Sequence, residues 1–198
     1  MSTSEDGLVG RTVALAWNRV DAVGLERFDL IREADTWRLR GTILLLVHQG
    51  VPFEARYEVT TDPAWVTRAV AVDLRGPQGD RSLRLTVEDG RWRQEDGAEI
   101  EALRGCVDGD LSWTPATNTL PIHRLDMAVG QDQTMTAAWV RFPELTLEPL
   151  PQEYRRLADR RYRYSSAGGR FVAELEVDDN GLVTRYGDIW TRVPVRDP

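Results

Sequence analysis

Few residues in this 198-residue chain are of the types that carry catalysis. His48 and His123 are its only histidines, and Cys106 is its only cysteine. The sequence holds no Gly-x-Ser-x-Gly nucleophile motif, no His-x-x-x-His pair and no glycine-rich phosphate loop. A single cysteine excludes an intramolecular disulfide and a cysteine-rich metal site, and we expect it to be a small buried apolar residue. The sequence therefore predicts no catalytic residue, no bound metal and no cofactor.

The carboxylates with the most suggestive spacing are Asp108 and Asp110, which would share one face of a strand. Paired carboxylates can work as acid and base, or bind Ca²⁺. The intervening Gly109 and the nearby Gly105 favour a turn, or an arginine partner, as their role. If the chain were an enzyme, its candidate acid and base groups would be Asp62, Asp108, Asp110 and His123. Whether any of them has a chemical role stays open at this point.

Seven tryptophans are spread over the whole chain. Most large aromatic side chains pack in a core, because each buries a large apolar area and needs a partner only for its indole N–H. In a protein that binds sugars or lipids, a few line the cavity instead. We expect roughly five to be structural and one or two to contact a ligand.

The most unusual stretch covers residues 110–125, which hold two prolines, three threonines and Asn118 within a short span. Such a composition argues against a regular central strand or a helix. It predicts an ordered loop pinned by side-chain hydrogen bonds that re-enters a strand at Ile122. A loop of this kind either braces the fold or borders a binding site, and the residues alone favour bracing.

The elements that must position these residues are predominantly strands. Alternating apolar and polar residues, separated by turn chemistry, predict strands over residues 12–19, 25–32, 36–48, 53–60, 65–74 and 81–87. Asp-Gly and Asn-Gly pairs predict hairpin turns at 88–90 and 179–181. Residues 98–103 and 152–157 are the only short helix candidates. Neither can serve as a crossover between parallel strands, so we expect an all-β, antiparallel fold.

Size and composition predict one domain over residues 1–198, with a polar, flexible N-terminus at 1–10. So many strands cannot stay flat, and must curl into a roll or partly open barrel or form a sandwich. A net charge of −7 argues against nucleic acid as a partner. The longest apolar run, residues 43–47, is too short to cross a bilayer, and no secretion signal is present, so a cytoplasmic location is expected. The oligomeric state is not determined by the sequence.

The 110–125 stretch resembles the signature of the bacterial "putative glycolipid-binding" family, a former domain of unknown function. The resemblance rests on Cys106-Val-Asp-Gly-Asp-Leu111 followed by Thr114-Pro-Ala-Thr-Asn-Thr-Leu-Pro-Ile-His-Arg-Leu125. Weaker matches extend over nearly the whole chain. Gly109 stands where the family pattern has Val, and His123 where it has the first of two arginines. The resemblance implies a many-stranded spiral β-roll, with at most short helices, similar to bacterial lipoprotein carriers.

Three functions follow as hypotheses. The resemblance favours binding of a glycolipid or other amphipathic small molecule, such as a fatty-acyl conjugate, in the apolar interior of the roll. The first alternative is a solid structural or adaptor roll that binds another protein, and the second is an enzyme acting on a lipid or sugar intermediate. For the first hypothesis, the candidate ligand contacts are the polar Thr117, Asn118, His123 and Arg124 and the aromatic Trp65, Tyr164 and Trp190.

Overall fold

The computed structural model describes residues 12–47 and 50–194. The flexible N-terminus predicted for residues 1–10, and His48, lie outside this part of the chain. Within it, fourteen strands form a single sheet. The strands are β1 (Thr12–Arg19), β2 (Val23–Glu33), β3 (Thr36–Val47), β4 (Val51–Thr61), β5 (Thr67–Arg75), β6 (Arg81–Glu88), β7 (Arg91–Gln94), β8 (Asp108–Leu111), β9 (Asp132–Arg141), β10 (Thr146–Ala158), β11 (Arg161–Ser166), β12 (Phe171–Val177), β13 (Val183–Tyr186) and β14 (Trp190–Arg192).

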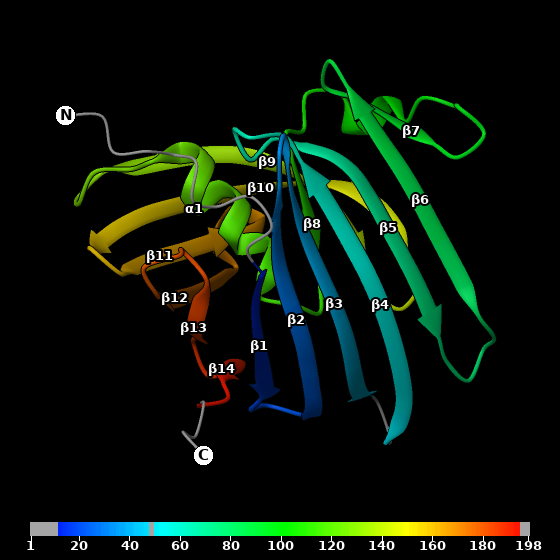
Figure 1. Cartoon of the computed structure of the whole chain (residues 1–198), viewed down its shortest axis with the longest axis horizontal. Helices are drawn as coiled ribbons and strands as arrows, with labels where there is room; N and C mark the ends of the chain where they lie inside the picture. Colours follow the sequence, from blue (N-terminus) through cyan, green and yellow to red (C-terminus); the bar gives the residue numbers. More distant parts are fainter. Residues whose placement is uncertain (1–11, 48–49, 195–198) are drawn as a thin grey trace.

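The sheet consists of two runs of strands that are neighbours in sequence, β1–β7 and β8–β14, and the two runs are joined where β1 pairs with β14. Its spatial order is β7-β6-β5-β4-β3-β2-β1-β14-β13-β12-β11-β10-β9-β8, so the first and last strands of the chain pair with each other. The sheet curls without closing, and Figure 1 shows β1–β7 forming one curved wall. The predicted all-β roll is confirmed. The expectation of purely antiparallel pairing is wrong at β8, which runs parallel to β9.

Alternation of side chains decides which face of each strand points inward. In β2–β4 the buried residues recur at every second position, as in Leu39, Ile43 and Leu45. Gly41 occupies the same inner face because the Tyr57 ring lies directly over it. A Cβ atom at Gly41 would lie 2.3 Å from that ring, so only glycine fits there.

Side-chain hydrogen bonds connect the two ends of the open sheet, where β8 and the segment before it contact β5 and β7. The Gly109 N–H in β8 donates to Thr67 Oγ1 at the start of β5, at 3.0 Å. The Trp92 indole N–H donates to the Cys106 carbonyl oxygen at 2.8 Å, and the Cys106 side chain is buried as predicted. A Cβ atom at Gly109 would already lie 3.0 Å from Val70. Glycine at position 109 therefore allows a closer approach of β8 to β5 than a valine would.

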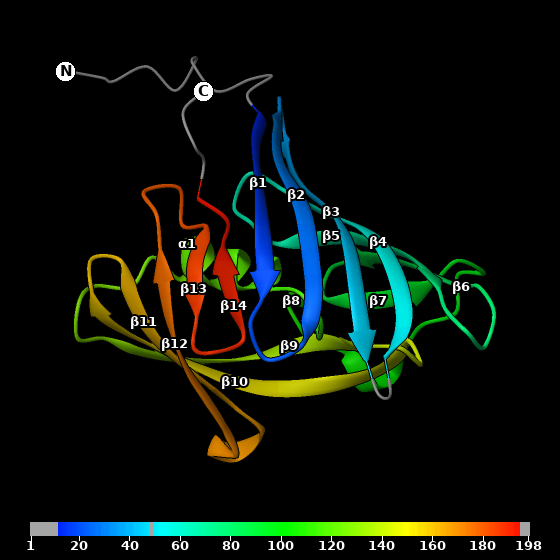
Figure 2. The same cartoon turned by 90° about the horizontal axis from the view of Figure 1, so that it is seen from below.

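A short helical segment fills the inside of the roll. It consists of a 3₁₀ turn, η3 (Ala116–Asn118), and the helix α1 (Thr119–Leu125), which lies behind β13 and β14 in Figure 2. The predicted strand at Ile122 is therefore wrong, and the predicted loop is limited to residues 112–115. The expected hydrogen bonds between side chains and backbone are present at Thr114 and Asn118. Pro121 is the third residue of α1, where the helix has no acceptor for a backbone N–H, so proline costs no hydrogen bond there.

Two smaller predictions had different outcomes. Residues 152–157 are not helical but belong to β10, the longest strand of the described chain. Residues 98–103 contain only the 3₁₀ turn η2 (Glu101–Leu103). Both predicted hairpin turns are present: Gly90 and Gly181 have positive φ angles of 70° and 67°. At the second turn, the Asp178 carboxylate accepts the backbone N–H groups of Asn180 and Leu182.

Most of the tryptophans belong to the core, as predicted. Trp17, Trp92 and Trp190 are among the largest fully buried side chains. Trp37 and Trp139 are only partly buried. None of the helices in the described residues is long and apolar enough to cross a membrane.

Candidate functional site

One cavity is lined by both aromatic and polar side chains, and it lies between the η3 segment and strands of the C-terminal half of the sheet. Its volume is about 320 Å³. The lining residues are Arg19, Asp110, Leu111, Ser112, Thr114, Asn118, Trp139, Leu150, Tyr164, Ser166, Ala167, Phe171, Tyr186, Ile189 and Trp190. We call it the inner cavity.

Asp110 supplies the carboxyl group of the inner cavity. Its Oδ1 accepts the Thr117 hydroxyl at 2.8 Å, and its Oδ2 accepts the Gln152 amide at 2.7 Å. The position follows from the pairing of β8, which sets Asp110 beside Trp139 of β9. Burial raises the pKa of Asp110, and these two hydrogen bonds partly oppose that rise. The remaining lone pairs of a carboxyl held in this way can accept hydroxyl groups of a ligand.

Thr117 braces this carboxyl, and the Asn118 amide is held by other partners. The Tyr154 hydroxyl donates to Asn118 Oδ1 at 2.9 Å, and Asn118 Nδ2 donates to the Pro115 carbonyl oxygen at 3.2 Å. Besides donating to Asp110, the Thr117 hydroxyl accepts the Leu111 N–H at 3.3 Å. Asn118 lines the cavity, as the sequence predicted, and Thr117 holds its acid in place.

Aromatic side chains, here called the aromatic wall, line the same cavity as these polar groups. The Tyr164 ring centroid lies 5.9 Å from that of Phe171 and 6.1 Å from that of Tyr186, both in edge-on geometry. Trp190 and Trp139 complete the wall. These rings also pack on one another, and together they give the cavity an apolar border. The wall can therefore pack against the C–H face of a sugar or against an aliphatic chain.

The charges around the inner cavity are paired. Arg19 is the cationic residue of the described lining, and its guanidinium is bonded to Asp21 while it lies 5.3 Å from the Trp190 ring centre. This ion pair also lowers the pKa of Asp21. A cavity with a paired cation and a buried carboxyl favours an uncharged ligand with hydroxyl groups over an anion.

Behind the cavity lies a second buried acid that sequence reasoning missed. Glu26, on the inner face of β2, accepts the Tyr57 hydroxyl and, at 2.8 Å, the Thr114 hydroxyl, both through Oε1. Its Oε2 is buried and has no hydrogen-bond partner within residues 12–47 and 50–194. Burial raises the pKa of Glu26 to about 8, so this side chain is a neutral carboxylic acid at pH 7. Thr114 connects Glu26 to the inner cavity, because Thr114 bonds to Glu26 and is also part of the cavity lining.

The other predicted contacts lie elsewhere. Arg124 donates to Asp108 from Nη2 at 2.7 Å and from Nε at 3.0 Å, which bears out the arginine partner expected for one of the two carboxylates. Trp65 and His123 stack on each other with ring centroids 4.0 Å apart, outside the inner cavity. Of the seven predicted contacts, the structure brings Asn118, Tyr164 and Trp190 together around the inner cavity.

The groups considered for acid–base chemistry do not converge. Asp62 accepts the backbone N–H groups of Ala64 and Val66 and pairs with Arg68. Asp108 pairs with Arg124, and Asp110 alone reaches the inner cavity. Among the residues that the structure describes, no cluster of three or more histidine, cysteine or acidic side chains could hold a metal ion.

A larger hollow of about 590 Å³ lies beside β9, β10 and the β11–β12 connection. Its described lining runs over Thr134–Thr136, Pro151–Glu153, Ser165, Ser166, Gly168 and Gly169, without an aromatic side chain. It therefore offers no ring on which a sugar or an acyl chain could pack, and we place the candidate site in the inner cavity.

Comparisons with known proteins agree with this fold. A family model described as "Putative glycolipid-binding" matches residues 14–192. The crystal structure of a DUF1089 family protein from Pseudomonas aeruginosa has 29% sequence identity to the chain and a TM-score of 0.79. The alignment covers 98% of this chain and 100% of that one. No curated protein matches the chain.

Proposed function

The chain belongs to the family described as "Putative glycolipid-binding", and from this premise we propose that its inner cavity binds the sugar part of an amphipathic ligand. One observation carries the proposal: a braced carboxyl and the aromatic wall line a single cavity. Sugars are bound by this combination, because ring faces pack on their C–H groups while carboxyl and hydroxyl side chains take their hydroxyls.

The volume of the inner cavity limits the size of the ligand group that it can hold. About 320 Å³ lies at the lower end of the range for small-molecule sites. The segments η3 and α1 and the core side chains fill much of the interior beside it. We therefore place a sugar ring inside the cavity and the aliphatic part at its mouth, in contrast to the acyl chain within the roll that the sequence suggested.

Binding, and not catalysis, is the proposed activity. Asp62 and Asp108 are each held in an ion pair, with Arg68 and with Arg124, and neither lines the inner cavity. This supports binding, because general acid–base chemistry needs its groups within reach of one substrate atom. The solid adaptor stays an alternative hypothesis, and so does the expected cytoplasmic location. An adaptor would bind a protein and leave the inner cavity without a ligand.

Calorimetric titration with an alkyl glucoside tests the proposal. We expect saturable binding by the wild-type chain and at least roughly tenfold weaker binding by Asp110→Asn, since a hydrogen bond to a charged group contributes about 1.5–3 kcal/mol. Asp73→Asn is the matched control, because Asp73 is an exposed residue on the outside of the roll. Native mass spectrometry of the purified protein adds a search for a bound lipid. Equal binding by both variants, or no binding of any glycoside, would contradict the proposal.

A further inference from the structure

A second, smaller cavity lies at the other end of α1. Its volume is about 230 Å³, and it is lined by Val13, Leu30, Arg32, Trp37, Trp65, His123, Asp179 and Asn180. None of the described residues that line it also lines the inner cavity. We call it the arginine cavity. It brings together β1–β3, the β4–β5 turn, α1 and the β12–β13 turn.

Four side chains form a continuous stack along this cavity. The Arg32 guanidinium lies 4.6 Å from the centre of the Trp37 ring, and the Trp37 and Trp65 ring centroids are 4.5 Å apart at 17°. His123 is the last member of the stack: its ring centroid lies 4.0 Å from that of Trp65, and the two ring planes are 3° from parallel. Such stacks fix the position of a guanidinium and contribute a cation–π attraction.

The backbone around the stack is specialised to hold it. Trp65 has a φ of 66°, a conformation that non-glycine residues seldom adopt, and its N–H donates to the Asp62 carbonyl oxygen at 3.1 Å. His123 Nε2 lies 2.8 Å from the Asn180 carbonyl oxygen. A Cβ atom at Gly181 would lie 2.6 Å from that nitrogen. Unusual backbone of this kind is found where a side chain must be placed for a function.

Arg32 lacks an acidic partner among the described residues, although its Nη1 is buried. A buried charged donor without an acceptor is costly, and such groups usually pair with an anion. The other charged group in the lining, Asp179, is already paired with Arg160. Burial lowers the pKa of His123, so its ring is neutral at pH 7 and adds no competing charge.

We propose that the arginine cavity is a second binding site, which takes a small organic anion with an apolar body. A carboxylate or phosphate group pairs with the fork of Arg32, whose planar donors match both groups. The apolar body lies against Val13 and Leu30 and along the edges of the tryptophan rings. This site is independent of the sugar site, which has no unpaired cation in its described lining.

Titration of the full chain with hexanoate, hexyl phosphate and hexanol, followed by calorimetry and tryptophan fluorescence, tests the proposal. We expect one or both anions to bind at least roughly tenfold more tightly than the alcohol, a difference of about 1.4 kcal/mol. Inorganic phosphate alone is expected to bind more weakly than hexyl phosphate, because it cannot use the apolar surface. Equal binding of hexanol and the anions would overturn the proposal, and so would equal binding of phosphate and hexyl phosphate.

Variants locate the effect. Arg32→Gln is expected to remove the preference for anions, and Arg32→Lys to keep part of it. Arg27→Gln, on the outer face of the same strand, is the matched control and should leave the preference unchanged. The wild-type comparison of ligands needs no variant, so it decides the case even if Arg32→Gln folds poorly. Alkyl glucoside titrations of Arg32→Gln should match the wild type, which separates a failure of this site from a failure of the sugar site.

Discussion

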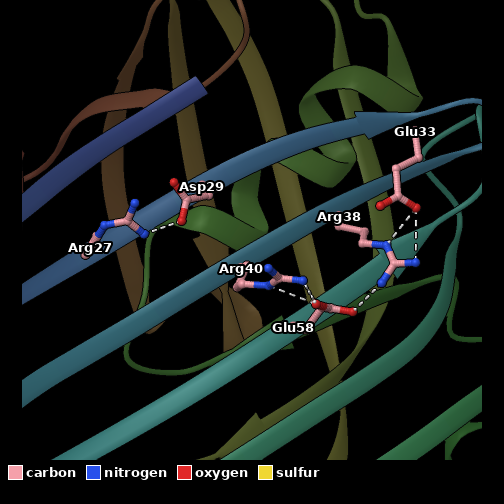
Figure 3. A network of polar contacts seen from close by, with 6 residues as sticks. All are labelled: Arg27, Asp29, Glu33, Arg38, Arg40 and Glu58. Atoms are coloured by element: carbon pink, nitrogen blue, oxygen red, sulfur yellow. Dashed lines mark hydrogen bonds and ion pairs between the residues drawn. The ribbon is translucent and has the colours of Figure 1, made fainter. Parts of the chain in front are cut away.

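The two faces of strands β2–β4 carry charged residues in opposite states. On the outer face, Arg38 pairs with both Glu33 and Glu58, and Arg40 pairs with Glu58. Figure 3 shows this network together with the Arg27–Asp29 pair on the face of the sheet opposite to α1. On the inner face of the same strands, one oxygen of Glu26 and one nitrogen of Arg32 have no partner among the described residues.

The difference separates charged side chains that form ion pairs within the sheet from buried ones that have no protein partner among the described residues. Outer-face residues find partners across neighbouring strands at little cost, because water still reaches them. An inner-face group without a partner costs free energy, and it persists only where another benefit offsets that cost. Arg32 has a cavity beside it, which suggests an anion, whereas Glu26 is sealed in and becomes neutral instead.

The pH dependence of stability provides the strongest test of the neutral Glu26. Between pH 4.5, the ordinary pKa, and about 8, the folded protein keeps this proton while the unfolded chain loses it. The free energy of unfolding should therefore fall as pH rises through this window, by up to about 5 kcal/mol, and level off above it. Urea unfolding at several pH values measures this slope.

Glu26→Gln should make the slope shallower, because glutamine cannot ionise, while the raised pKa of Asp110 leaves a smaller slope of the same sign. Glu33→Gln on the outer face is its control and should leave the slope as in the wild type. If the slopes of Glu26→Gln and the wild type coincide, Glu26 does not fold as a neutral acid and this half of the comparison fails.

Asp108 and Arg124 form an ion pair that is largely buried. Asp108 has a side-chain exposure of 2% and Arg124 of 18%. Asp108→Ala should lower the free energy of unfolding by about 3–5 kcal/mol, because it leaves Arg124 without its carboxylate in a buried place. Chemical denaturation at pH 7 measures it. A loss below about 1 kcal/mol would mean that water reaches the pair as it reaches the outer network.

Arg40→Ala should have the smallest effect. Arg40 is about half exposed, and exposed ion pairs contribute at most about 1 kcal/mol. Denaturation at low and high salt measures this loss, which should shrink as salt screens the pair. A loss as large as that of Asp108→Ala would show that the two faces do not differ in the way proposed.

The strands of the N-terminal half were predictable because each follows a local pattern. Alternating residues such as Leu83, Leu85 and Val87 mark a half-buried strand without any knowledge of its neighbours. The Asp-Gly and Asn-Gly turns were predictable for the same reason. The residues 152–157 misled because their composition suits a helix, whereas pairing with β9 and β11 decides their structure.

The candidate site was less predictable, because it depends on contacts that are distant in the sequence. Pro115 and Pro121 argued against a helix, yet Pro121 falls within the first turn of α1, where a proline is tolerated. Asn118 and Trp190 were found through the family resemblance. The acid at Glu26 gave no signal, because an isolated glutamate within a strand looks like any solvent-facing residue until its face of the sheet is known.

The most direct test of the central claim, that the inner cavity binds a sugar, is the nuclear magnetic resonance spectrum of the indole N–H groups. Titration with octyl glucoside should shift the Trp190 and Trp139 resonances in a saturable way and leave that of Trp92, which is bonded to a backbone carbonyl, unchanged. Octanol at the same concentrations should not reproduce these shifts. Unchanged Trp190 and Trp139 resonances, or equal shifts with octanol, would contradict the account.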